Sequence, residues 1–133
     1  MFGPWTLTDG HGIEVIRVPL HGLSGCTDGR RIWLDTHLTD TEVRCALTHK
    51  LVHISRGHER HQTPASEASV RAATARLLIP WDAITVHIGS QLDEWHLAQE
   101  LGVTIHVLAD RLQYASIEEL RALRAAAAHP EAC

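Results

Sequence analysis

One predicted helix, which begins at Thr39 and ends before Gly57, constrains the chain more than any other feature. Thr39 and Glu42 have the spacing of a capping box, in which each side chain accepts a hydrogen bond from the other residue's backbone. Gly57 is a typical helix stop. His49 and His53 lie four positions apart inside this helix, so their side chains project from the same face. A pair with this spacing can hold one metal ion.

The remaining sequence predicts strands before this helix and further helices after it. Apolar and polar side chains alternate over residues 13–18 up to Pro19, and an Asp-Gly turn leads into a second strand over residues 31–35. We expect these strands to form a small antiparallel sheet. Periodicity, prolines and a second capping pattern predict helices over residues 65–79, 81–90, 92–101, 104–114 and 116–128. The predicted fold class is α+β, with a helical core and short C-terminal helices.

The length and composition predict a single domain. A chain of 133 residues can bury one core but has little room for a second. We divide it into a sheet region (1–38), metal-site helices (39–90) and a C-terminal helical part (91–133). No apolar run approaches the roughly 20 residues of a membrane helix, and the amino terminus has no signal-peptide pattern. Three cysteines without motif spacing suit reduced thiols, so we expect a cytoplasmic protein with no membrane partner.

Lys50 is the only lysine of the chain, and it directly follows the first histidine of the pair. In zinc peptidases with this histidine spacing, the residue at that position is glutamate. Its carboxylate takes a proton from the attacking water and passes it to the leaving amine. An ammonium group cannot do this. The sequence therefore has the frame of a metallopeptidase but lacks the usual general base.

The histidine pair becomes a specific signal only with a third ligand, because the chain contains eleven histidines. The extended zinc-peptidase pattern would need a glycine in place of Arg56 and a histidine in place of Glu59, and it has neither. Glu67 lies near the start of the next predicted helix. From there its carboxylate can complete three protein ligands and leave a fourth coordination position open.

Five other residues are candidates for a role at the site, and for each a structural interpretation is favoured. His58 and His61 are oxyanion-binding residues or alternative ligands, or else solvent-facing loop residues. Asp82 orients a ligand histidine or caps the helix after Pro80. Cys45 approaches the metal or is simply buried, and Tyr114 either has a catalytic role or is distant from the site.

A series of motifs connects the histidine pair to the helix that follows: His49-Lys50-Leu51-Val52-His53, Gly57-His58, Glu67 and Leu77-Leu78-Ile79-Pro80. This combination resembles the ImmA/IrrE family of zinc metallopeptidases, whose pattern is HExxHxxxGH followed by a helix reading about ExxANxFAxxLLxP. The resemblance extends from about residue 13 to about residue 123. It is greatest to the compact versions that bacteriophages of high-GC hosts carry.

The resemblance implies a fold, a metal and a partner. The fold would be a zincin core of the gluzincin type, with His49, His53 and Glu67 as ligands of Zn²⁺. The strand over residues 31–35 would be the edge that holds an extended substrate. The implied activity is regulatory proteolysis of a protein or peptide, with a helix-turn-helix repressor as the type of partner. A phage-encoded chain would act in the cytoplasm of the host cell.

Departures from the family pattern lead us to expect little or no peptide hydrolysis. Lys50 replaces the general base, and Val70, Arg71 and Ala73 replace the family's usual alanine, asparagine and aromatic residue. Two states of the metal site compete. Zinc stays bound beside a neutral or displaced lysine, or zinc is absent and the ammonium stands near Glu67 in its place. Retained zinc is favoured because its ligands lie on two packed helices. The alternative function is a non-catalytic regulator that still binds such a partner.

The segment around Gly102 resembles a helix-turn-helix, with Thr104 opening its second helix. That helix offers Arg111 and Gln113 to DNA, but also Asp110, in a chain of formal net charge -4. The ImmA/IrrE family commonly ends in a similar helix pair that packs on the peptidase core. The structural interpretation is therefore favoured, and no nucleic-acid partner is expected.

Overall fold

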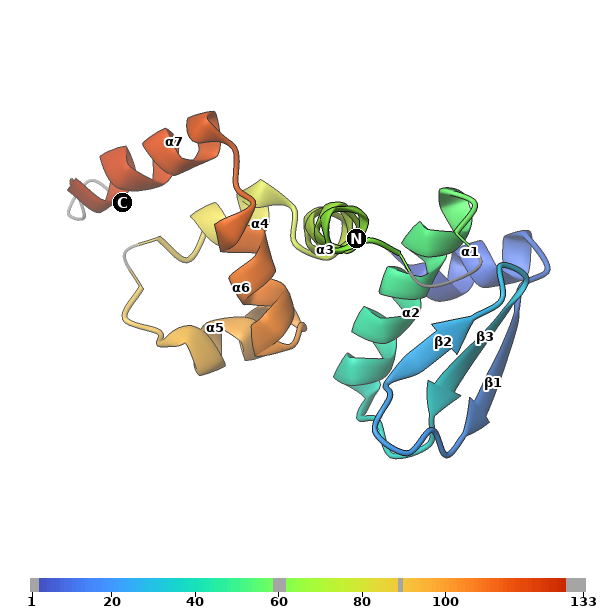
Figure 1. Cartoon of the computed structure of the whole chain (residues 1–133). Helices are drawn as coiled ribbons and strands as arrows, with labels where there is room; N and C mark the ends of the chain where they lie inside the picture. Colours follow the sequence, from blue (N-terminus) through green and yellow to red (C-terminus); the bar gives the residue numbers. More distant parts are fainter. Residues whose placement is uncertain (1–2, 59–61, 89, 129–133) are drawn as a thin grey trace.

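Seven helices and a three-stranded sheet form the α+β fold of the computed structural model, which describes residues 3–58, 62–88 and 90–128 (Figure 1). The predicted fold class is confirmed. None of the described helices is long and apolar enough to cross a membrane. In chain order the elements are α1 (Pro4–Gly10), β1 (Glu14–Val18), β2 (Gly25–Thr27), β3 (Arg31–Asp35), α2 (Asp40–Ser55), α3 (Pro64–Leu78), α4 (Trp81–Thr85), α5 (Glu94–Leu101), α6 (Ile105–Gln113) and α7 (Ile117–Ala128).

The sheet is mixed, whereas the sequence had led us to expect an antiparallel sheet. β3 lies in the centre, in the order β1-β3-β2. β2 and β3 are antiparallel and joined by the turn that contains Gly29, whose φ is 95°. β1 runs parallel to β3 along its other edge. Alternation and the Asp-Gly turn predicted the strands over residues 13–18 and 31–35, but neither signal tells which edge a third, short strand occupies.

α2 begins and ends where the sequence predicts. The Thr39 hydroxyl accepts a hydrogen bond from the Glu42 backbone N–H at 3.2 Å, and Glu42 Oε1 accepts one from the Thr39 N–H at 3.0 Å. This capping box sets the first turn. Arg56 is the C-terminal cap residue, and Gly57 follows with a φ of 73°, a left-handed conformation that glycine adopts without strain.

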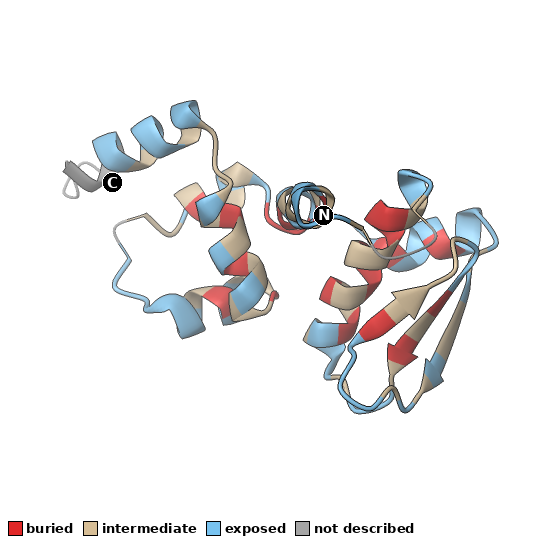
Figure 2. Ribbon diagram, in the orientation of Figure 1, coloured by how far each residue is buried: buried red, intermediate tan, exposed pale blue. Residues whose placement is uncertain are grey.

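Two apolar clusters lie on the two sides of α2, as the buried parts of Figure 2 indicate. The first joins the sheet to α2 and consists of Ile32, Leu34, Val43, Leu47 and Leu51. The second joins α2 to the later helices and consists of Cys45, Leu78, Ile79, Ile84, Ala98, Val103 and Leu108. α2 also packs against α3. Contacts on several sides hold this helix in place, and with it the two histidines.

The helix pair α5–α6 packs on the core. Gly102 caps α5 with a φ of 69°, and its carbonyl accepts a hydrogen bond from Arg44 of α2 at 2.7 Å. Arg111, the residue that a DNA-binding interpretation would place on the nucleic acid, is only 3% exposed. Its Nε donates to the Ile79 carbonyl at 2.8 Å, and its guanidinium carbon lies 5.0 Å from the Trp81 ring centroid. This arginine is therefore unavailable to DNA.

Arg111 also anchors the start of α7. Its two terminal nitrogens donate to Glu119 Oε1 at 3.1 Å and Oε2 at 2.6 Å. Glu119 Oε1 accepts a further bond from the Ser116 backbone N–H, and the Ser116 hydroxyl accepts from the Glu119 N–H. The capping pattern expected at Ser116 is thus present. Its glutamate serves a second purpose that the sequence did not reveal, the neutralisation of a buried cation.

Candidate metal centre

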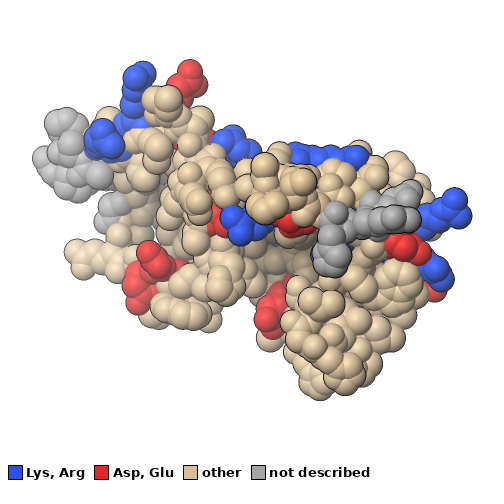
Figure 3. All heavy atoms as spheres, viewed as in Figure 1, with Lys and Arg blue, Asp and Glu red and all other residues tan. Residues whose placement is uncertain are grey.

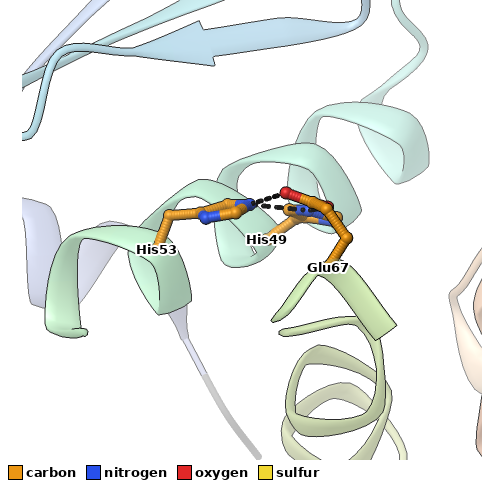
Figure 4. Close-up of side chains that lie close together, drawn as sticks. All are labelled: His49, His53 and Glu67. Carbon is orange, nitrogen blue, oxygen red and sulfur yellow. Dashed lines mark hydrogen bonds and ion pairs between the residues drawn. The ribbon is translucent and has the colours of Figure 1, made fainter. Parts of the chain in front are cut away.

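α2 and α3 bring three potential metal ligands to one point (Figure 4). The Nε2 atoms of His49 and His53 are 3.2 Å apart. Glu67, in the first turn of α3, places Oε1 2.9 Å from the Nε2 of His53 and Oε2 3.4 Å from the Nε2 of His49. The donor atoms of all three side chains lie within 4.8 Å of one another. The ligands selected from the sequence therefore meet in space.

These distances fit a tetrahedral zinc ion. Zinc binds imidazole nitrogen at about 2.0–2.1 Å and carboxylate oxygen at about 2.0–2.2 Å, so two of its tetrahedral ligand atoms lie about 3.3 Å apart. The two histidine Nε2 atoms are 3.2 Å apart, and the two carboxylate oxygens of Glu67 lie one 2.9 Å from His53 and the other 3.4 Å from His49. Two histidines and one glutamate are also the ligands of several catalytic zinc sites, which keep a fourth position open. The donor set therefore fits Zn²⁺ in both chemistry and spacing.

Both histidines are held in the neutral form that a metal requires. Burial, the nearby positive charge of Lys50 and the neighbouring His53 lower the pKa of His49 to about 4. Burial also lowers the pKa of His53, whose side chain is 6% exposed. Neutral imidazoles keep a free lone pair near pH 7, and metal ligands must be deprotonated. The site therefore does not have to expel protons from its histidines to bind a metal at this pH.

His58 contacts the Nδ1 of His53, the ring nitrogen opposite the one that faces His49 and Glu67. The two Nδ1 atoms are 3.0 Å apart, and the His58 backbone N–H donates to the His53 carbonyl at 2.9 Å. When the Nδ1–H of His53 donates to His58, its Nε2 lone pair faces Glu67 and His49. The interpretation of His58 as a solvent-facing residue is therefore wrong, because the turn at Gly57 folds it back onto the helix. His61 and Glu59 lie outside the described residues.

We predict that His58→Ala lowers the zinc affinity of the chain by about 10- to 100-fold, the usual effect of removing a partner that orients a ligand. His53 would lose the acceptor that fixes its tautomer. Competition with a chromophoric zinc chelator measures this change. His11→Ala, which removes an exposed histidine, is the matched control. Equal zinc affinities in the two variants would contradict the orienting role of His58.

Lys50 follows His49 in sequence and points along the sheet side of α2. The place that a Cβ would take on Gly25 of β2 is 3.6 Å from Lys50 Cε, so the lysine stem lies against this strand. Burial lowers the pKa of Lys50, and the carboxylate of Glu67 partly opposes this shift. A cation near the ligands also works against metal binding, since like charges repel.

A cleft of about 310 Å³ adjoins the ligand cluster. Its walls come from α2, α3 and α6, and Lys50, Arg71, Val107 and Asp110 are among its lining residues. His49 belongs to both the cleft and the ligand cluster. On the face in Figure 3, the molecule is hollowed between the helical part and the part with the sheet. A ligand in the cleft would therefore contact one of the histidines.

The free edge beside Lys50 is β2, whereas the sequence led us to expect the strand over residues 31–35. That strand, β3, is the central strand, with β1 and β2 on either side. The expectation is wrong because β2, a three-residue strand that the alternating pattern did not reveal, covers the edge of β3 on the side of α2. An extended segment added to the sheet next to the cleft would therefore pair with Gly25–Thr27.

Three other candidates lie apart from the ligand cluster found among the described residues. Cys45 is 6% exposed, burial raises the pKa of its thiol, and it packs in the helical apolar cluster. The Tyr114 hydroxyl accepts a hydrogen bond from Arg71 at 2.9 Å. Asp82 lies in the first turn of α4, but Pro80 holds the cap position, so the capping expected of Asp82 is not observed.

Comparisons with known proteins give no match: no protein-family model, no curated protein and no solved structure matches the chain. The candidate metal centre is therefore supported by the donor atoms of the three ligands, their separations and the neutral state of both histidines.

Proposed function

We propose that the chain is a zinc-binding domain of the metallopeptidase type, similar to the ImmA/IrrE family, that binds a peptide segment without hydrolysing it efficiently. The observation that carries the proposal is the meeting of His49, His53 and Glu67 within 4.8 Å, with lysine directly after His49. The ligands supply a complete donor set for zinc. The lysine removes the usual general base.

Each residue of the site has a separate task in this proposal. Zn²⁺ bound there would act as a Lewis acid toward the carbonyl group of a bound peptide. The Nδ1 of His58, 3.0 Å from the Nδ1 of His53, would accept the Nδ1–H of His53 and so hold the tautomer whose Nε2 binds metal. Lys50, when protonated, cannot take a proton from water. Binding and polarisation of a peptide would thus be retained, while proton transfer by a protonated Lys50 would not.

The surroundings of the site suit an extended peptide. β2 is an edge strand next to α2, so its backbone can pair with an added strand. The cleft beside it has room for a side chain of that segment. The regulated partner in this proposal is a protein with an accessible segment, of the helix-turn-helix repressor type that the family resemblance implies. On the face in Figure 3 acidic and basic side chains are interspersed, and a nucleic-acid partner is not proposed.

Metal content tests the proposal. The chain, purified without added zinc, is expected to contain about one zinc ion per molecule by elemental analysis. His53→Ala, which removes the most buried ligand, should lose this zinc while keeping the helical circular dichroism of the parent. A zinc content near zero in the natural chain, also after dialysis against micromolar zinc, would overturn the proposal.

A further inference from the structure

We infer that the cleft beside the metal centre binds the C-terminal carboxylate of a peptide, with the ammonium group of Lys50 as its ion-pair partner. This inference rests on the proposed function, because the metal bound by His49 and its neighbours would supply a second positive charge. It names the substrate class of that site: a free chain end rather than an internal peptide bond.

Lys50 is a partly buried cation on which the carboxylate of Glu67 acts through its charge, but without direct contact. No hydrogen bond or ion pair joins its ammonium group to any side chain in the described parts of the chain. The other cation of the cleft, Arg71, is already engaged: it donates to the Tyr114 hydroxyl at 2.9 Å and lies 3.9 Å from Asp110. A partly buried ammonium with no direct hydrogen-bond partner is unfavourable, and a ligand carboxylate in the cleft would supply one.

The sign of the charge at position 50 selects between two kinds of ligand. A glutamate there would repel a carboxylate and would tolerate a neutral peptide bond. A lysine reverses this preference, because its positive charge attracts the carboxylate. A carboxylate also has two oxygens, so it can face both the ammonium and the side of the cleft formed by His49. An internal peptide bond carries no such charge.

The shape of the cleft favours a peptide end over a small free anion. Its volume of about 310 Å³ exceeds what a small carboxylate would fill, and its walls include the apolar side chains of Leu38, Ala46 and Val107. The stem of Lys50 lies against Gly25 in the edge strand β2. A peptide that pairs with β2 and ends at Lys50 would place its last side chain in this apolar space.

A pair of peptides that differ only at the chain end tests the inference. Fluorescein-labelled Ala-Ala-Leu, as the free acid and as the C-terminal amide, is titrated with the zinc-loaded full chain, and fluorescence anisotropy gives the two affinities. The acid is expected to bind at least tenfold more tightly than the amide. Lys50→Gln should remove this preference, and Lys50→Arg should keep it, since arginine also pairs with carboxylates.

Three outcomes would overturn the inference: equal binding of acid and amide, a preference that survives in Lys50→Gln, or acetate that competes as strongly as the acid peptide. The last would reduce the cleft to a site for small anions. Zinc content is measured in the same samples. A zinc-loaded chain with no preference for the acid would refute the inference and leave the proposed function intact, whereas a chain without zinc would refute the proposed function itself.

Discussion

Replacing Lys50 by glutamate is expected to give the chain a chelator-sensitive peptidase activity that we do not expect of the chain with Lys50. The ligand side chains already lie within 4.8 Å of one another, so the substitution adds only the missing general base next to His49. A positioned base contributes about 10²- to 10⁴-fold to the rate of such a reaction. The same change removes the cation that opposes zinc binding, so zinc affinity should also rise. A mixture of quenched fluorescent peptides measures cleavage, and chelator competition measures zinc affinity.

Lys50→Gln separates the two effects of this substitution. It removes the positive charge without supplying a base, so it should raise zinc affinity but give no cleavage. Cleavage by the natural chain that a chelator abolishes would contradict the assigned role of Lys50. A zinc-loaded Lys50→Glu variant that leaves the whole peptide mixture intact would contradict the view that only the base is missing.

Replacing Glu119 by glutamine is expected to lower the free energy of unfolding by about 3 kcal/mol, the typical cost of breaking a buried ion pair. Arg111 is 3% exposed, and Glu119 accepts hydrogen bonds from both of its terminal nitrogens. Glutamine would leave the buried guanidinium without a counter-charge. Urea unfolding followed by circular dichroism measures the change.

The adjacent Glu118 provides a matched control, because it has the same charge and is exposed. Glu118→Gln should change the free energy of unfolding by less than about 0.5 kcal/mol. Similar losses of stability in the two variants would show that general charge, rather than the pairing with Arg111, is responsible.

The same ion pair predicts how stability depends on pH. Hydrogen bonds from Arg111 hold the pKa of Glu119 at about 2, below its ordinary value of 4.5. A carboxyl group with a depressed pKa stabilises the fold fully above its unfolded pKa, and this contribution is lost as pH falls toward the folded pKa. The unfolding free energy of the natural chain should therefore fall more steeply between about pH 4.5 and about pH 2 than that of Glu119→Gln. Parallel curves would contradict this assignment.

The ligand cluster was predictable from the sequence because its information is local. The spacing of His49 and His53 places both on one face of a helix whose start and stop are also encoded nearby. Glu67 falls in the first turn of the next helix, after a short connection, which limits how far it can lie from the pair. Helix periodicity and a short loop were sufficient to choose these three ligands.

The pairing of the strands was not predictable in this way. Alternation predicted β1 and the Asp-Gly turn predicted β3, but β2 has only three residues and leaves too short a pattern. Which strand lies in the centre depends on how the hairpin packs on α2. Because the strand order is β1-β3-β2, the sheet is mixed. The free edge beside the candidate metal centre is therefore β2 rather than the expected β3.

The sequence by itself predicted most of the helices, the three candidate ligands and the charge at position 50, because each follows from short-range spacing and residue type. It did not predict α1, and α4 ends at Thr85 rather than at residue 90. Only the tertiary structure decided what surrounds these helices and ligands. It folded His58 back onto His53, buried Arg111 against Glu119, and placed Lys50 in a cleft with no hydrogen-bonded or ion-paired side chain in the described part of the chain. The physical reason is that these partners lie in different helices or in the turns that follow them, so packing chooses them and leaves no periodic pattern in the order of residues.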